Sequence, residues 1–437
     1  MRHRLVLFLT LVLLCLHSVA LADGGGPKIR VGLAVGQFST QIESTGKIHI
    51  QDTNGRKAVL PAGRHFISVK QGALYADQNK LKDSLISLLA GDPKNPVLVN
   101  GKKYRGALTI HLNSNKKTLT VINTLPLEQY LYGVVAKEVM PLWPDEAIKA
   151  QAVAARSFAL YHMQNPDGPE YDLKANEMGQ VYGGSAAEHA NTSKLVDATR
   201  GIAALYQGAP IQAYFHSSGG GYTEAASAVW GRDIPYLQAV KDYDSDSPRY
   251  AWKKEFTKVQ LERLLSQNGY VLGSLKGIRL SARTEAPMKW TPDRGVSGRV
   301  KRLTFIGTMK SVTVDGNKVR SLLGLDSTLF EIAIGVKRPD SLDVEITNGY
   351  GYPVGKKTIP LGKDEDEGGA SVGDLRLFTD VAGEKVLFTG NGWGHGVGLS
   401  QWGARGMALS KQAKGKKDYY RQILAHYYKG ITIKQVY

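Results

Sequence analysis

A helical segment from Leu125 to His162 lies between two long regions of strand-like sequence, and this alternation most constrains the fold. Lys28 to Leu112 contains short apolar runs separated by Gly, Asn and Asp, and a similar pattern returns from Ile202 to Val240. Short apolar runs bounded by turn residues are typical of β-strands. We therefore expect a mixed α+β fold, with a β-rich N-terminal part, a helical segment, and a further β-rich part with a glycine-rich C-terminal motif.

The chain of 437 residues is long enough for two or three domains. We expect a leader over residues 1–22, a β-rich N-terminal region over 23–120, and a region over 121–437 that carries the functional motifs. That last region is expected to hold a β-rich insertion near 250–380, in which "VKRLTFIG" and "SVTVDGNKV" form a hairpin. The acidic run "KDEDEGG" within the insertion is expected to be a solvated loop.

The first residues have the pattern of a secretory signal peptide. A basic start precedes an apolar run from Leu5 to Leu14, and Ala20-Leu21-Ala22 supplies a small-x-small cleavage site. The apolar run is too short to favour a membrane span. Cys15, the only cysteine, lies inside this leader, and the lipid-anchor alternative would require a small residue in place of Leu14. We expect cleavage near Ala22 and a mature protein that is secreted or periplasmic in the cell envelope, with no membrane span or disulfide.

The mature chain is expected to be strongly basic. The leader carries two of the 56 Lys and Arg and none of the 39 Asp and Glu, so a net charge of +17 becomes +15. An exported protein rarely meets nucleic acid, which we exclude as a partner. A basic surface outside the cytoplasm is suited to an anionic envelope polymer or a lipid headgroup, with a contribution to solubility alone as the alternative.

One acidic residue lies at the end of an apolar helical face. Leu131, Val134 and Glu138 follow helical spacing, and Pro141 is expected to end the helix. Partial burial and the negative end of the helix dipole both favour the protonated carboxyl. A carboxyl that keeps its proton near neutral pH can act as a general acid. The alternative is a partly exposed glutamate at a helix end without a role.

A second helix is expected to begin near Pro144, and it is rich in alanine. Small side chains let other elements approach this helix closely, and Gln151 lies on it as a candidate for substrate binding. Arg156 would be costly to bury among alanines unless it meets an anion or a cleft. It either binds a substrate carboxylate or supports Glu138, or it forms a structural ion pair.

The same residues resemble a known family. The stretch "LPLEQYLYGVVAKEVMPLWPDEAIKAQAVAARSFALYH" is similar to the core signature of the stage II sporulation protein D (SpoIID) family, which amidase enhancers share. The likeness continues in order through "GQVYGG", "IQAYFHSSGGGYTE", "VWGRDIPYLQAV", "SGRVKRLTFIG", "GNGWGHGVGLSQWGARGMA" and "ILAHYYKG". It covers the chain from about Tyr104 to the C-terminus. Several long motifs in the same order make the resemblance specific.

The resemblance implies a peptidoglycan lytic transglycosylase that acts on glycan strands, notably strands without stem peptides. Glu138 corresponds to the family's catalytic glutamate, and Arg156 corresponds to the motif arginine. We expect Arg156 to hold the lactyl carboxylate or to orient Glu138. One carboxylate suffices because the C6 hydroxyl of the sugar replaces water as nucleophile, which gives a 1,6-anhydromuramyl end. Hydrolytic glycosidases generally need two carboxylates. The alternative from the family is a non-catalytic wall-binding protein that enhances a cell-wall amidase.

The other motifs supply candidate substrate-binding residues. Tyr182 is expected to contact sugar or Glu138, or else to belong to a turn. His216 and Ser218 are alternate residues of a strand and are expected to line a sugar cleft. In the glycine-rich motif the glycines are expected to permit close approach to substrate, and Trp393, His395 and Gln401 are assigned to substrate binding. Trp402 is the second tryptophan of this motif, with core packing as its leading interpretation.

We expect no metal and no cofactor. Some family members carry a zinc site of His and Cys, but the corresponding span from Gln164 to Gly179 contains neither residue. The run "DYDSDS" resembles the start of a calcium loop, but Ser247 replaces the glycine and Lys253 the final acid that such a loop needs. The glycine-rich motif lacks the spacing of a dinucleotide-binding fingerprint.

Overall fold

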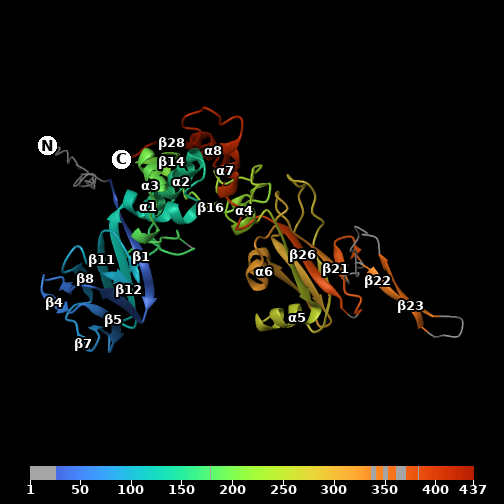
Figure 1. Cartoon of the computed structure of the whole chain (residues 1–437), viewed down its shortest axis with the longest axis horizontal. Helices are drawn as coiled ribbons and strands as arrows, with labels where there is room; N and C mark the ends of the chain where they lie inside the picture. Colours follow the sequence, from blue (N-terminus) through green and yellow to red (C-terminus); the bar gives the residue numbers. More distant parts are fainter. Residues whose placement is uncertain (1–25, 178, 336–340, 348–352, 361–370, 382) are drawn as a thin grey trace, which may run out of the picture.

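The computed structural model describes residues 26–177, 179–335, 341–347, 353–360, 371–381 and 383–437. Helices and strands are both abundant, which confirms the mixed α+β class. Buried hydrophobic residues form three separate clusters: one in the N-terminal sheets, one around the helices, and one in the region from Phe256 to Phe388. Figure 1 shows these parts in that spatial order, with the helical part in the middle.

The N-terminal part consists of two sheets that enclose one core. Alternate residues along the strands are buried, as in β11, where Leu108 and Ile110 face the core and their neighbours do not. The seven-stranded sheet has the order β13-β1-β12-β11-β8-β3-β4 and the six-stranded sheet β10-β9-β2-β5-β6-β7. The strands are β1 (Lys28–Gln37), β2 (Ser39–Ser44), β3 (Ile48–Asp52), β4 (Lys57–Leu60), β5 (Gly63–Lys70), β6 (Ala73–Ala76), β7 (Asn79–Lys80), β8 (Leu85–Ala90), β9 (Leu98–Val99), β10 (Lys102–Lys103), β11 (Ala107–Leu112), β12 (Leu119–Pro126) and β13 (Leu173–Lys174).

The strand β12 connects this sheet directly to the helical part. It pairs with β1 along its length and runs without a break into α1 (Leu127–Glu138), so the sheet fixes where that helix begins. On the other edge of β1, the short strand β13 pairs in parallel after the second helix. The sheet therefore holds both ends of the segment that contains the helical motif.

The central helix α2 (Asp145–Gln164) is buried on almost every side, and alanine is the commonest of its buried residues. A helix that is apolar all round requires neighbours on all faces, and small side chains let their backbones come close. Its neighbours include α1, α3, α7, α8 and β14. The remaining elements here are η1 (Ser185–Ala187), α3 (Ala190–Ala198), β14 (Ile202–Tyr206), β15 (Ala209–Pro210), β16 (Phe215–His216), α4 (Ala226–Trp230), β27 (Leu399–Ser400), α7 (Gln401–Leu409), α8 (Tyr420–Tyr427) and β28 (Thr432–Gln435).

The third part packs two sheets and two helices around its own core. The sheets have the orders β17-β26-β21 and β20-β19-β18-β25-β24, and a hairpin of β22 and β23 projects at the far end of Figure 1. The elements are β17 (Ala251–Thr257), α5 (Lys258–Gln267), β18 (Leu275–Arg279), β19 (Arg302–Gly307), β20 (Ser311–Asp315), α6 (Gly316–Leu323), β21 (Phe330–Gly335), β22 (Ser341–Thr347), β23 (Pro353–Pro360), β24 (Ser371–Val372), β25 (Leu375–Leu377) and β26 (Lys385–Asn391).

The hairpin expected from "VKRLTFIG" and "SVTVDGNKV" is present as β19 and β20, but it is shorter than expected. The second strand ends at Asp315, whose side chain accepts a hydrogen bond from the backbone N–H of Asn317 at 2.8 Å. Asp315 is thus the N-cap of α6, and "GNKV" is helical. An Asp-Gly pair after a strand fits a turn and a helix cap equally well, which explains the error.

Two expectations lie outside the described residues: the signal peptide with Cys15, and the acidic loop "KDEDEGG". Among the residues that the structure does describe, no helix has both the length and the apolar character needed to cross a membrane.

A buried ion pair joins the first two helices. Arg156 and Glu128 are almost inaccessible to solvent, and the guanidinium donates to both carboxylate oxygens, at 2.8 and 2.7 Å. Arg156 also donates to the carbonyl oxygens of Val196 and Ile202, both at 3.1 Å. The hydroxyl of Tyr437 donates to the same carboxylate. This pair therefore holds together α1, α2, the end of α3, the start of β14 and the C-terminus.

We expect Arg156→Met to lower the free energy of unfolding by about 3–5 kcal/mol, because it leaves the carboxylate of Glu128 buried without a counter-charge. Denaturant titration measures this loss. The matched control is Arg200→Met, which removes a half-exposed arginine paired with Asp197 and should change stability by about 0.5 kcal/mol or less. Equal effects of the two substitutions would contradict a stabilising role for the buried pair.

Candidate active site

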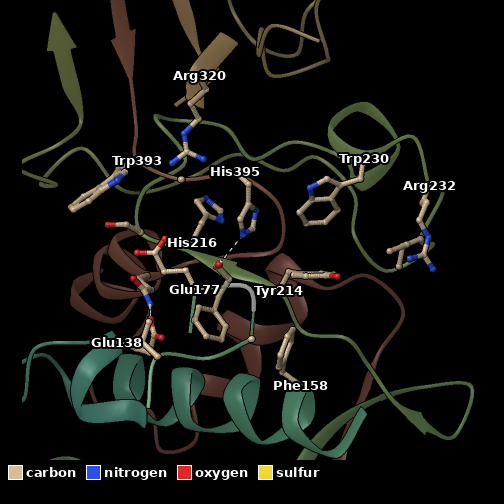
Figure 2. Close-up of a pocket in the computed structure, with 17 residues that line it drawn as sticks. Glu138, Phe158, Glu177, Tyr214, His216, Trp230, Arg232, Arg320, Trp393 and His395 are labelled. Carbon is tan, nitrogen blue, oxygen red and sulfur yellow. Dashed lines mark hydrogen bonds between the residues drawn. The ribbon is translucent and has the colours of Figure 1, made fainter. Parts of the chain in front are cut away.

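An open cleft of about 620 Å³ lies where the helical part meets the third part of the molecule. Its volume is suitable for a small molecule or for a segment of an oligomer. Figure 2 shows Glu138 on one side, Arg320 on the other, and two histidines between them in that view. The lining residues are Glu138, Phe158, Glu177, Gly179, Val181, Tyr214, Phe215, His216, Ser217, Trp230, Arg232, Ile234, Arg320, Trp393, Gly394, His395 and Gln401.

Glu138 is the last residue of α1 and its side chain is partly buried in the cleft wall. Gln401, the first residue of α7, donates its amide N–H to Oε2 of Glu138 at 3.0 Å, and the backbone N–H of Val181 also donates to the carboxylate. Burial raises the pKa of Glu138 above its ordinary value, although these two donors and Lys137 act in the opposite direction. The group is thus an acid with an elevated pKa that opens onto a cleft.

Two neutral histidines form the floor between Glu138 and Arg320. The Nε2–H of His395 donates to the carbonyl oxygen of Phe215 at 3.0 Å, and its Nδ1 accepts from the N–H of Val397. Burial, with Arg299 nearby, lowers the pKa of His395 to about 3. Burial, the neighbouring imidazole and Arg299 also hold the pKa of His216 well below its usual range. Neither imidazole ring is positively charged near neutral pH.

His216 differs from His395 because one of its ring nitrogens is unpaired among the described residues. Its Nδ1–H donates to the carbonyl oxygen of Val397 at 3.1 Å, which leaves Nε2 as a hydrogen-bond acceptor. Among the described residues, this buried Nε2 has no partner. A hydroxyl or an amide N–H of a ligand in the cleft would satisfy it.

The glycine-rich motif brings Trp393 and His395 to the cleft by packing closely against a buried side chain and against protein backbone. A Cβ at Gly396 would lie 2.1 Å from Nε of Arg299, and a Cβ at Gly398 would lie 2.1 Å from the carbonyl oxygen of Tyr214. Both glycines also have positive φ, at 80° and 71°. These two glycines therefore permit close approach of protein segments, and not of substrate as the sequence analysis expected.

The two tryptophans of this motif have different surroundings. Trp393 lines the cleft, is 43% exposed, and has the guanidinium of Arg249 at 4.5 Å from its ring centre. Its open face can stack on a sugar ring. Trp402 packs edge-on against Trp143 at 4.9 Å and contacts the central core. Its surroundings are those of a packing residue.

Four residues assigned from the sequence lie outside the described lining of the cleft. The hydroxyl of Tyr182 donates to Oδ1 of Asn123 at 3.2 Å, and its ring packs against Tyr130. Ser218 is buried and donates to a carboxylate oxygen of Asp244. Gln151 is also buried, and neither atom of its amide has a hydrogen-bond partner among the described residues. The fourth residue is Arg156.

Arg156 does not meet the expectation that it binds a substrate carboxylate or supports Glu138. Its five N–H groups face Glu128, Val196, Thr199 and Ile202, and its side chain is inaccessible to solvent. The structure therefore places it in the ion pair that was the alternative. The physical reason is that α1 carries a carboxylate near each end, Glu128 and Glu138, and Arg156 on α2 lies beside Glu128.

Several cleft residues were missed by sequence reasoning. Tyr214 precedes His216 by two residues in the motif "IQAYFHSS", so strand alternation was a signal for it. Phe158 follows Gln151 by seven positions on α2, so helical spacing places it on the same face of α2 as Gln151, which had been predicted to bind substrate. Trp230 belongs to a motif quoted for the resemblance, but nothing in its spacing indicated the cleft. Glu177 and Arg320 carried no local signal, because each comes from a segment that only the tertiary fold brings to Glu138.

Two aspartates of "DYDSDS", Asp242 and Asp244, accept hydrogen bonds from backbone N–H groups. Asp244 accepts hydrogen bonds from the N–H groups of Gly220 and Gly221 at 2.7 and 2.9 Å, and Asp242 accepts from the N–H of Gly219 and from the hydroxyl of Tyr427. Within the part of the chain that the structure describes, no group of three or more His, Cys, Asp and Glu residues is arranged to hold a metal ion.

Comparison with known proteins places this fold and cleft in a family. A family model described as Stage II sporulation protein matches residues 115–206. Stage II sporulation protein D of Bacillus amyloliquefaciens is 30% identical over 331 residues, which cover 72% of this chain and 76% of that protein. The protein of the same name from Bacillus subtilis is 29% identical over 335 residues, with the same coverage. The chain belongs to the stage II sporulation protein D family.

A second kind of relative matches more of this chain. The amidase enhancer of Bacillus subtilis is 30% identical over 392 residues, which cover 85% of this chain. This match covers only 50% of the amidase enhancer, so the chain spans about half the length of that relative.

We expect Gln401→Leu to raise the pKa of Glu138 further, because the amide of Gln401 donates a hydrogen bond that favours the ionised carboxylate. The titration of side-chain carboxyl carbons by NMR measures the shift. Gln422→Leu, on the exposed face of α8, is the matched control and should leave the titration of Glu138 as it is. A lower pKa of Glu138 in Gln401→Leu would contradict the assigned contact.

Proposed function

We propose that this protein is a lytic transglycosylase of peptidoglycan, which cleaves glycan strands and leaves 1,6-anhydromuramyl ends. The observation that carries the proposal is Glu138, a carboxyl with a raised pKa that lines the cleft. It occupies the position that the family resemblance gives to the catalytic acid. Membership of the stage II sporulation protein D family agrees with this assignment.

In the proposed reaction, Glu138 first donates its proton to the oxygen that bridges two sugars. The bond between that oxygen and C1 of the muramyl residue then breaks. The C6 hydroxyl of the same residue attacks C1 and gives its proton to the carboxylate of Glu138. One carboxyl thereby serves as acid and then as base, and no water is consumed. The amide of Gln401 and the N–H of Val181 stabilise the intermediate carboxylate.

The walls of the cleft have the character of a carbohydrate site. Trp393, Tyr214 and Trp230 offer flat apolar faces, and the unpaired Nε2 of His216 is an acceptor for a hydrogen bond from a sugar hydroxyl or an acetamido N–H. Neutral histidines suit this role better than charged ones, because a neutral imidazole keeps an acceptor nitrogen. The expected mature charge of +15 is complementary to glycan strands that carry free carboxylates.

The cleft also contains Glu177, a second carboxylate, on an exposed loop. Two carboxylates could in principle activate water, as in glycoside hydrolases. The products separate the two reactions: transglycosylation gives anhydro ends, whereas hydrolysis gives reducing ends that are heavier by one water.

We expect the purified protein to convert stripped glycan strands into fragments with anhydromuramyl ends, as detected by mass spectrometry. Glu138→Gln should lower the rate at least about 100-fold, because an amide cannot donate or receive the proton. The matched control is Glu255→Gln, which changes an exposed glutamate on β17 and should leave the rate as in the wild type. Reducing ends in place of anhydro ends would contradict the transglycosylase proposal.

A second candidate function is the enhancement of a cell-wall amidase without glycan cleavage, which the 85% coverage by the amidase enhancer favours. This candidate predicts that an added amidase releases stem peptides faster in the presence of the protein. It also predicts that Glu138→Gln enhances as well as the wild type, since binding does not need the proton. Amidase stimulation without any anhydro product would establish this function in place of the first.

A further inference from the structure

One cation in the cleft has no assigned role and open hydrogen-bond donors. Arg320 lies on α6 of the third part, and its Nε donates to the carbonyl oxygen of Leu325 at 3.3 Å. Among the described residues, neither terminal nitrogen of Arg320 has a hydrogen-bond or ion-pair partner. Asp326, an acid whose charge acts on Arg320, pairs with Arg249 at 2.9 Å. The guanidinium is therefore held by one bond and presents its other donors to the cleft.

The neighbouring Arg299 differs from Arg320 in that its terminal nitrogens have hydrogen-bond partners. Arg299 is fully buried, and its terminal nitrogens donate to the carbonyl oxygens of Gly219 and Gly394 at 2.9 and 3.2 Å. These bonds hold the glycine-rich motif against the loop after β16, so Arg299 has a structural function. Arg232 is the other cleft-lining arginine, and it is exposed to solvent. Only Arg320 among these three combines partial burial with free terminal donors.

We propose that Arg320 binds the free lactyl carboxylate of a muramyl residue and thereby makes the cleft selective for glycan strands without stem peptides. This inference rests on the proposed function. A guanidinium presents two parallel N–H groups that match a carboxylate, and such charged pairs are stronger in a partly buried site than in water. In an intact strand the same lactyl group is an amide, which has no charge and carries a peptide that must fit between the walls.

The geometry of the cleft supports this assignment. In Figure 2, Arg320 faces Glu138 across the two histidines, so the acid and the cation line the same cleft from opposite sides. Arg156 was assigned this carboxylate from the sequence, but its donors are all used by buried partners. Arg320 supplies the cation that the site otherwise lacks at this position.

The negative charge of Glu177 opposes the binding of a substrate carboxylate at Arg320. It lines the same cleft, and its negative charge acts on Arg320. A lactyl carboxylate at Arg320 must therefore be accommodated beside an existing anion. Removal of this charge should strengthen the binding of carboxylate-bearing strands, which is opposite in sign to the loss of Arg320.

The test measures binding, so that cleavage is not required. Glu138→Gln serves as the background, and two ligands are made from one preparation: stripped glycan with free lactyl carboxylates, and the same glycan with those groups converted to methylamides. Calorimetry gives both dissociation constants. Arg320→Gln should weaken binding of the free-acid glycan by about 10-fold to 100-fold, as expected for a charged hydrogen-bonded pair, and change binding of the methylamide glycan by no more than about twofold.

Three further variants sharpen the result. Arg320→Lys keeps the charge but loses the paired donors, so it should recover part of the affinity for the free-acid glycan. Glu177→Gln should increase that affinity. Arg263→Gln removes an exposed arginine from α5 of the same part and serves as the matched control for net charge. It should change both dissociation constants by no more than about twofold.

The outcomes separate this inference from the proposed function. The free-acid glycan can bind while Arg320→Gln weakens the binding of both glycans equally, or weakens the binding of neither. In both cases the assignment of Arg320 is wrong and the proposal of a glycan-binding cleft stands. If neither glycan binds to the Glu138→Gln background, the proposed function fails, and the role of Arg320 fails with it.

Discussion

The hydrogen bond between Gln401 and Glu138 is the contact on which the cleft depends, because it joins the end of α1 to the start of α7. These residues are far apart in sequence, and the chain passes through the whole third part between them. Parallel pairing of β16 with β27 brings the glycine-rich motif back to the helical part, and Ser400 caps α7 so that Gln401 points at the acid. The raised pKa of Glu138 follows from the enclosure that this return creates.

Much of the fold was predictable because it depends on local patterns. Strand alternation near Ile110, the apolar face of α1, and the alanines of α2 each report burial directly in the sequence. The position of Glu138 at the last turn of α1 follows from the same reasoning, since Pro141 lies just beyond it. His216, Trp393, His395 and Gln401 were predicted as substrate-binding residues from two separate motifs, and the structure brings them to one cleft with Glu138.

The rest could not be predicted because it depends on which partners meet across the fold. Arg156 needed an anion, and sequence could not decide between Glu128 and a substrate carboxylate. Gly396 and Gly398 of the C-terminal motif each needed a close neighbour, and the sequence could not show that these neighbours are Arg299 and Tyr214. Arg320 lies in a helix whose pattern has no link to the cleft. In each case the residue type indicated that an interaction partner was needed, and only the tertiary structure showed which group is that partner.

The cleft is shared between two hydrophobic cores that pack independently: Glu138 extends from the core around α2, and Arg320 from the core that contains Phe305 and Phe388. This division places Glu138 and Arg320 on separately packed parts of the molecule. Under the proposed function, substitutions in the third part can therefore alter the wall that faces the substrate while Glu138 and its two hydrogen-bond donors stay in place.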